Sequence, residues 1–255
     1  MILAIDVGNT NIVIGCIDQN KAWFVERLST VRTKTELEYA VDIKTVLDLY
    51  SVDLDGIEGS IISSVVPQIT GSLKLAVEKV LKKMPLVLGP GLKTGLNILM
   101  DNPATVGADL VAAAVAGIAL YTVPLILIDM GTATTVTVVD EKKRYIGGLI
   151  YPGIGISLDA LTSHAAQLAG ISLEAPRRVI GKNTADSMRN GILYSNAAAL
   201  DGIIDRIEGE LGVEACRVAT GGLAKKVVSL CRKEIILDEE LILKGLFIIY
   251  ERNRV

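Results

Sequence analysis

The sequence predicts an α/β protein in which one domain scheme occurs twice. The first observation is a short apolar strand that ends in Asp6 and a glycine turn, followed by a β-branched strand over 12–17. The second is a copy of this pattern, in which Asp129 and Gly131 keep the spacing of Asp6 and Gly8. The third is the alternation of strand and helix patterns after each copy, which is typical of α/β layers. These patterns together favour a duplicated domain.

The two glycine turns have the chemistry of an anion site. Glycine permits positive φ and lets backbone N–H groups come close to a bound group, and such N–H groups favour phosphate. Asp6 and Asp129 end their strands beside the turns, where a carboxylate can hold a cation that neutralises phosphate charge. One such turn is most often a plain turn, but two in register predict a nucleotide between two halves.

Composition bounds the class of protein. The chain has 255 residues, of which 50% are hydrophobic, so it can bury a large core in one or two domains. Lys and Arg number 26 against 29 acidic residues and form no basic run, which gives no support to nucleic-acid binding. Cys16, Cys216 and Cys231 are scattered in apolar stretches. We expect reduced core thiols in a cytoplasmic protein, not a metal site.

One apolar stretch, 110–128, is long enough to suggest a membrane span. Pro124 interrupts it, and Asp109 and Asp129 bound it, so the pattern favours a helix, a loop and a buried strand. The amino terminus enters the first strand without a basic segment or a cleavage pattern, so no signal peptide is expected.

Further elements follow in order along the first half. Thr35 and Glu38 form a capping box in front of a helical pattern. Ser63 and Ser64 end a strand at an edge where α/β proteins often bind ligands, although a plain strand-to-helix turn is the simpler interpretation. The expected elements are strands over 22–28, 57–66 and 86–88 and helices over 35–49 and 72–82.

A long irregular segment, 89–103, leads to Asp109 at the start of an alanine-rich helix. Loops of this length are usually functional or disordered. Asp109 has an ordinary interpretation as a capping or first-turn acid. On sequence alone, this interpretation is preferred to a catalytic role. The sole histidine, His164, has no evident partner and is interpreted as a packing or surface residue. The second half predicts strands over 145–150 and up to 218, and helices over 156–168, 184–210 with Thr184 as N-cap, and 241–250.

Six motifs, taken in chain order, resemble the type III pantothenate kinase family. They are DVGNTN at 6–11, VGAD at 106–109, DMGTATT at 129–135, GGLIYPG at 147–153, GKNT at 181–184 and TGGLA at 220–224. As a set they span nearly the whole chain and are highly specific. The family belongs to the superfamily of acetate and sugar kinases, heat-shock chaperones and actin.

The resemblance implies duplicated actin-like (ribonuclease H-like) domains, 1–118 and 119–255, with a nucleotide cleft between them. It implies transfer of the ATP γ-phosphoryl group to the hydroxyl of pantothenate, an alcohol acceptor, giving 4'-phosphopantothenate in the first step of coenzyme A biosynthesis. It also implies Mg²⁺ with ATP, a monovalent cation such as K⁺ or NH₄⁺, and a cytoplasmic homodimer. No nucleic acid or membrane is expected among its partners.

The resemblance also assigns roles to residues of this sequence. Asp109 would be the general base that accepts the proton of the pantothenate hydroxyl. Asp6 would lie near Mg²⁺, and Asp129 would hold the monovalent cation. The nucleotide-binding residues would be Asp6, Val7, Gly8, Asn9, Thr10, Asn11, Ile12, Val13, Thr132, Gly221 and Gly222. The pantothenate site would comprise Met100, Gly107, Ala108, Asp109, Leu110 and Thr184.

The sequence departs from the family pattern at the acceptor end. Leu110 stands where the family has an arginine, and Met100 stands where it usually has a tyrosine. Leucine lacks the charge and the planar donor fork with which arginine binds carboxylates or phosphates. Three interpretations follow: a pantothenate kinase, a kinase for another hydroxyl compound, or a nucleotide-binding regulator without catalysis. Retention of Asp109 favours a kinase.

Overall fold

The computed structural model describes residues 1–19, 21–164, 171–176 and 178–254, which fall into two compact units. Unit 1 comprises Met1–Leu120 and Glu240–Val255, and unit 2 comprises Tyr121–Glu239. The chain passes from unit 1 to unit 2 after Leu120, two residues beyond the boundary expected after residue 118. The final segment, from Glu240 on, belongs to unit 1, whereas the resemblance implies a second domain over 119–255.

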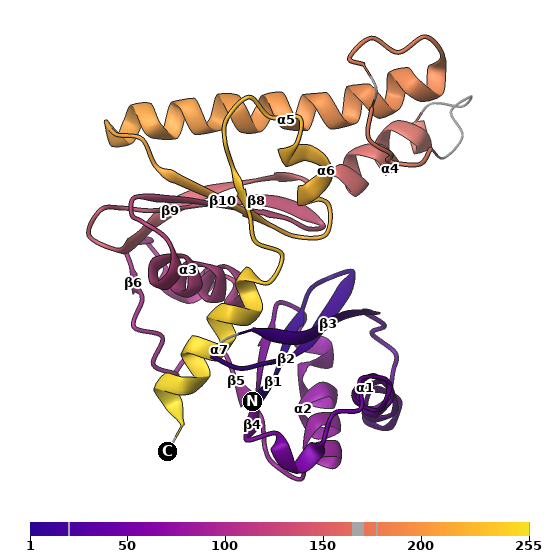
Figure 1. Cartoon of the computed structure of the whole chain (residues 1–255), viewed down its shortest axis with the longest axis vertical. Helices are drawn as coiled ribbons and strands as arrows, with labels where there is room; N and C mark the ends of the chain where they lie inside the picture. Colours follow the sequence, from indigo (N-terminus) through magenta and orange to yellow (C-terminus); the bar gives the residue numbers. More distant parts are fainter. Residues whose placement is uncertain (20, 165–170, 177, 255) are drawn as a thin grey trace. The chain divides into compact units, whose positions relative to one another are not determined.

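Unit 1 is built on a mixed sheet with the strand order β3-β2-β1-β4-β5 (Figure 1). The central strand β1 pairs antiparallel with β2 and parallel with β4, so the predicted hairpin lies at the middle of the sheet. The strands are β1 Ile2–Val7, β2 Asn11–Ile17, β3 Ala22–Ser29, β4 Gly59–Ser64 and β5 Leu86–Val87. The short segments β6 (Asn97–Ile98), η1 (Leu54–Gly56) and η2 (Pro103–Thr105) complete the connections.

Helices cover both faces of this sheet. Leu3 and Ile5 of β1 pack on one face with α1 (Glu36–Leu49) and α2 (Pro67–Leu81). The alternate residues, Ile2 and Ala4, pack on the other face with α3 (Ala108–Leu120) and α7 (Leu241–Asn253). Gly245 of α7 faces the Ala112 backbone at a separation that no side chain could occupy. The last helix therefore completes the core of unit 1.

The helix starts of unit 1 test the local signals in the sequence. The Thr35–Glu38 capping box is present at α1, as predicted. The start predicted for α2 at residue 72 is wrong, because the helix begins at Pro67, a residue whose fixed φ suits the first helical position. The stretch over 110–128 forms the rest of α3, a loop and most of a strand, as predicted. Within the described ranges, no helix is both long and apolar enough to span a bilayer.

Unit 2 repeats the strand order of unit 1, as β9-β8-β7-β10-β11 (Figure 1). Its central strand β7 pairs antiparallel with β8 and parallel with β10, as β1 does with β2 and β4. The strands are β7 Leu125–Met130, β8 Ala133–Val139, β9 Arg144–Pro152, β10 Cys216–Thr220 and β11 Ile236–Leu237. The duplication predicted from the two turns is confirmed.

The helices of unit 2 are α4 (Ile154–His164), α5 (Thr184–Leu211) and α6 (Ala224–Val228). Apolar residues of β7 pack on one face with α5 and α6. The helix predicted over 156–168 begins earlier, at Ile154, and residues 165–170 lie outside the described chain. His164 ends α4, and its side chain also lies outside the described part.

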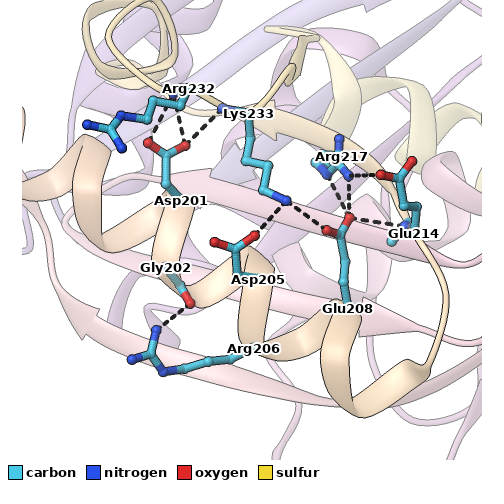
Figure 2. Close-up of polar contacts among 10 residues, drawn as sticks. Asp201, Gly202, Asp205, Arg206, Glu208, Glu214, Arg217, Arg232 and Lys233 are labelled. Atoms are coloured by element: carbon cyan, nitrogen blue, oxygen red, sulfur yellow. Dashed lines mark hydrogen bonds and ion pairs between the residues drawn. The ribbon is translucent and has the colours of Figure 1, made fainter.

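Ion pairs fasten the second half of α5 to the sheet (Figure 2). Glu208 accepts from the Arg217 Nε on β10 at 2.8 Å and from the Lys233 Nζ at 3.1 Å. The side chains of Glu208 and Arg217 are only 10% and 13% exposed. Asp201, two turns earlier on α5, accepts the Lys233 backbone N–H at 3.0 Å. The long helix is thus held by charge as well as by apolar packing.

Candidate functional site

The first glycine turn joins β1 to β2 in unit 1. The Gly8 N–H donates to the Asn11 carbonyl oxygen at 3.0 Å, which closes the turn. Thr30, directly after β3, donates its hydroxyl to the Gly8 carbonyl oxygen at 2.7 Å and its N–H to the Thr10 carbonyl oxygen at 3.0 Å. The turn is therefore held from a neighbouring strand, while the side chains of Asn9, Thr10 and Asn11 are exposed.

Two residues expected in the first phosphate loop have buried side chains. Val7 is 0% and Ile12 is 1% exposed, and both belong to the core that the sheet forms with α1 and α2. Their side chains are therefore occupied by packing, and only their backbone groups are available to a nucleotide. Val13 lies on the opposite face of the sheet, where it is the partner on β2 of Asp6 on β1.

Asp6 lies near the carboxyl end of β1 and is 8% exposed. The parallel register places it beside Ser63 of β4. Side chains alternate along a strand, so Asp6 shares the face of Ile2 and Ala4, which α3 and α7 cover. Asp6 thus lies at the edge of the sheet formed by the carboxyl ends of the parallel strands β1 and β4, on the face that α3 covers.

Asp109 lies in the first turn of α3, close to the same edge. A Cβ atom built on Gly107 would lie 3.5 Å from the Val65 side chain, which directly follows β4. The N-terminus of α3 therefore meets the carboxyl end of β4, next to β1. Unit 1 brings Asp6 and Asp109 to one edge of its sheet, although the two acids are far apart in the sequence.

The Asp109 carboxylate accepts a local backbone hydrogen bond and has a raised pKa. Asp109 is an acid in the first turn of α3, as the sequence predicts, and its Oδ1 accepts the Leu110 N–H at 2.8 Å. Burial raises the pKa of Asp109 above its usual value, and the hydrogen bonds from backbone amides only partly offset this rise. A partly desolvated carboxylate is a stronger base than one in water. Asp109 therefore combines the position of a first-turn acid with the raised pKa of a base.

The neighbours of Asp109 explain parts of the VGAD motif. A Cβ atom at Gly107 would overlap Asp109 Oδ1, so a side chain there would displace the carboxylate. Ala108 and Leu110 are half-buried, and Leu110 brings no charge to the edge. Met100 is 36% exposed in the segment between β6 and η2.

The second glycine turn repeats the first in unit 2. The Gly131 N–H donates to the Ala133 carbonyl oxygen at 3.1 Å, and Thr132 is exposed at the tip. Asp129 lies opposite Thr135 on β8 and beside Thr220 on the parallel strand β10. Each unit thus carries an acid, a glycine turn and a hydroxyl on the neighbouring parallel strand.

Gly221 closes this arrangement in unit 2. Its φ of +97° lies in the region that favours glycine. A Cβ atom there would lie 2.6 Å from Asp129 Oδ1 and 2.7 Å from Met130 N, so the backbone passes directly beside the acid. Gly222 follows, exposed, at the start of the short turn into α6.

The role predicted for Thr184 as N-cap of α5 is wrong, because Asn183 caps the helix. The Asn183 Oδ1 accepts the Asp186 N–H at 2.8 Å, and Thr184 is the first helical residue. An asparagine and a threonine in sequence are both good caps, so the pattern alone could not choose. Thr184 belongs to unit 2, whereas Met100 and Asp109 belong to unit 1, so neither unit by itself gathers the whole expected pantothenate site.

The cation sites expected at the two acids have oxygen donors. In the described ranges, no group of three or more His, Cys, Asp or Glu residues could hold a metal alone. Mg²⁺ commonly binds through one or two carboxylates together with substrate phosphates, which fits Asp6. The Ser63 hydroxyl, in register beside Asp6, is buried without a hydrogen-bond partner among the described residues, and so is the Thr135 hydroxyl opposite Asp129. The sequence suggests Ser63 only as part of a plain turn and gives Thr135 no separate role, since the signal for both hydroxyls is the register between strands.

Two sheets of one strand order, each with an acid and a glycine turn on its central hairpin, define the actin-like ATPase fold class. Solved structures share this fold at low identity. A conserved Baf family protein from Campylobacter jejuni has a TM-score of 0.58 and 21% identity, covering 99% of this chain and 98% of its own. The activator of 2-hydroxyisocaproyl-CoA dehydratase from Clostridium difficile, solved with bound ADPNP, has a TM-score of 0.56 and 12% identity, covering 98% and 93%.

Within this class, the chain belongs to the type III pantothenate kinase family. The model of that family matches residues 2–206. The type III pantothenate kinase of Bacillus cytotoxicus is 47% identical over 255 residues, covering 100% of this chain and 97% of the relative. The family resemblance carried by the six motifs is confirmed.

Proposed function

We propose that Asp109 is the general base in the ATP-dependent phosphorylation of pantothenate, the first step of coenzyme A biosynthesis. Membership of the type III pantothenate kinase family supports this activity. The observation that carries the role of Asp109 is a half-buried carboxylate of raised pKa near the strand ends that also hold Asp6. The reaction makes the chain a phosphotransferase with an alcohol group as acceptor.

Phosphoryl transfer depends mainly on positioning and on neutralisation of charge. In our proposal, backbone N–H groups of the turn around Gly8 bind phosphate oxygens, and Asp6 holds Mg²⁺. When bound, Mg²⁺ would neutralise negative charge on the phosphates. Asp109 takes the proton of the pantothenate hydroxyl as the oxygen attacks the γ-phosphorus in line. The proton ends on the carboxylate, and ADP leaves.

Unit 2 supplies the second set of nucleotide contacts in this proposal. Thr132, at the exposed tip of its turn, binds ATP phosphates, and the glycine backbone at Gly221 and Gly222 lies along the adenosine. The lack of side chains at these glycines supports a close approach of a ligand. Asp129 holds a monovalent cation, K⁺ or NH₄⁺, and Thr184 contributes to the pantothenate site.

We further propose a cytoplasmic homodimer. The three cysteines are all free thiols, which suits a reducing compartment. In unit 2, Ile150, Val179 and Ile180 are 72%, 62% and 78% exposed, a set of apolar side chains that a second copy would cover. Sedimentation equilibrium should give twice the chain mass, and Ile180→Glu should shift the population towards monomer. A monomer at all concentrations would contradict this part of the proposal.

The variant Asp109→Asn tests the proposed base. Asparagine can keep the hydrogen bond from the Leu110 N–H but cannot accept a proton. We expect ADP release that depends on pantothenate to fall by at least about 100-fold, the size typical of a lost general base. ATP affinity, measured by titration calorimetry, should stay unchanged. Full activity in Asp109→Asn would refute the assignment.

A kinase for another hydroxyl compound is the second candidate. It is favoured by Leu110, which brings no cation to the acceptor end. A panel of hydroxyl compounds at equal concentration distinguishes the two: a pantothenate kinase gives its largest kcat/KM with pantothenate, whereas a neutral acceptor with a larger value would establish the alternative.

A further inference from the structure

Two serines of β4 bury a hydroxyl that finds no partner in the described part of the chain. Ser60 is 2% exposed and Ser63 is 0% exposed, and neither Oγ makes a hydrogen bond. Buried polar groups in native proteins are nearly always paired, so each exception needs a cause. A water or an ion in the functional state is one such cause.

The two serines face different surroundings. Ser60 pairs in register with Leu3 and lies on the sheet face of Ile62, which forms the aliphatic core with α1 and α2. Ser63 pairs with Asp6 and lies on the face covered by α3. Only Ser63 therefore lies next to an acid and near the N-terminus of a helix.

The strand-to-helix turn after β4 is made by the Ser64 hydroxyl and not by that of Ser63. The Ser64 hydroxyl lies 2.8 Å from the Thr70 hydroxyl and accepts the Val66 N–H at 3.2 Å. Ser64 thus makes the strand-to-helix turn into α2, which is the ordinary role expected for the pair. Ser63 takes no part in this turn, although its hydroxyl is fully buried.

Unit 2 has a matching arrangement. Thr220 pairs with Asp129 on parallel strands as Ser63 pairs with Asp6. Thr220 is 3% exposed. The duplicated fold therefore places a hydroxyl beside the acid in each unit, which supports a shared role near the bound nucleotide.

We propose that Ser63 is a positioning residue whose hydroxyl hydrogen-bonds a water in the hydration shell of the Mg²⁺ at Asp6. This inference rests on the proposed function of Asp6. Mg²⁺ held by one or two carboxylates keeps several waters, and those waters need partners on the protein. Groups that orient the ligands of a metal typically change its affinity by 10- to 100-fold. Ser63 is placed beside Asp6, where its hydroxyl, without a partner among the described residues, can orient such a water.

The test compares Ser63→Ala with Ser60→Ala in the full chain. Both variants remove a buried hydroxyl from the same strand, so their effects on folding should be alike, with thermal midpoints without ligand equal to or above wild type. Only Ser63→Ala should raise the Mg²⁺ concentration at which ATP binding is half-maximal, by about tenfold. Ser63→Cys fills the space but bonds weakly, and it should show the same shift.

Calorimetry of ATP binding at graded Mg²⁺ gives this result without catalysis. An equal Mg²⁺ dependence in wild type, Ser63→Ala and Ser63→Cys would overturn the role of Ser63, as would a shift of the same size in Ser60→Ala. A wild-type protein that binds Mg²⁺ and ATP but phosphorylates no pantothenate would refute the proposed acceptor alone. Failure of wild type to bind ATP at any Mg²⁺ concentration would overturn both.

Discussion

Gly221→Ala tests how closely the backbone of unit 2 must pass the acid at the end of β7. Alanine at φ +97° adopts a conformation that side chains disfavour, at a cost of about 1–2 kcal/mol. Its Cβ would lie 2.6 Å from Asp129 Oδ1 and 2.7 Å from both the N and the C of Met130. Two of these atoms belong to the backbone and cannot rotate away, so the strand end must shift, at a cost of about 1–3 kcal/mol.

Gly212→Ala is the matched control. Gly212 caps the C-terminus of α5 at φ +72°, and a Cβ there would meet nothing within 4 Å. This variant therefore bears only the conformational cost of about 1 kcal/mol. The total for Gly221→Ala is about 3 kcal/mol, the difference being the close approach to Asp129 and Met130.

Thermal unfolding and ATP titration give the two readouts. We expect the Tm to fall by about 3 °C in Gly212→Ala and by about 9 °C in Gly221→Ala. At a temperature where both variants are folded, ATP affinity should fall by at least about tenfold in Gly221→Ala only, since the glycine turn and Asp129 are displaced. Equal falls in Tm, or unchanged ATP affinity in Gly221→Ala, would refute this reasoning.

Three further predictions concern charge. Burial raises the folded-state pKa of Asp109 above its unfolded value, so the ionised carboxylate opposes folding. Asp109→Asn should therefore raise the Tm at pH 7, and this increase in Tm should shrink as the pH falls towards 3.8. A lower Tm for Asp109→Asn at pH 7 would contradict this. Burial raises the pKa of Glu208, but hydrogen bonds from Arg217, the Ala215 N–H and Lys233 outweigh this effect, so the pKa of Glu208 is lowered. The stability that Glu208 contributes is therefore present above its unfolded pKa and is lost as the pH falls through its folded pKa. Glu208→Ala should therefore destabilise by about 3 kcal/mol at pH 7 in urea unfolding, with a smaller loss in acid, and a constant difference across pH would count against the ion pair. Leu110→Arg should lower the KM for pantothenate several-fold with little change in kcat, because it adds a carboxylate-binding fork; an unchanged KM would show that position 110 does not face the acceptor.

Local patterns predicted much of the fold. The hairpins around Gly8 and Gly131 followed from glycine between β-branched runs, and the capping box at Thr35 fixed the start of α1. These signals act between residues close in sequence, so they can be recognised without the tertiary structure. The start of α2 is not evident from the sequence, because the β-branched pattern of the expected strand continues to residue 66, whereas β4 ends at Ser64 and the helix begins at Pro67.

The remaining features depend on contacts between distant segments. An apolar pattern over 241–250 predicts a helix but not its partners, so the packing of α7 in unit 1 could not be foreseen. The pair Ser63 and Ser64 shows the same limit within the candidate site. Only the register with β1 reveals that one serine faces Asp6 while the other makes a turn. The place of Asp109 beside that edge likewise depends on the packing of Gly107 against Val65.

The most direct test uses ATP labelled with ¹⁸O in the γ-phosphoryl group. The full chain is incubated with the labelled ATP, Mg²⁺, K⁺ and pantothenate, and products are identified by mass spectrometry, with Asp109→Asn in parallel. The account predicts 4'-phosphopantothenate that carries the label with wild type and almost none with the variant. Bound nucleotide without phosphopantothenate, or equal product from both proteins, would contradict it.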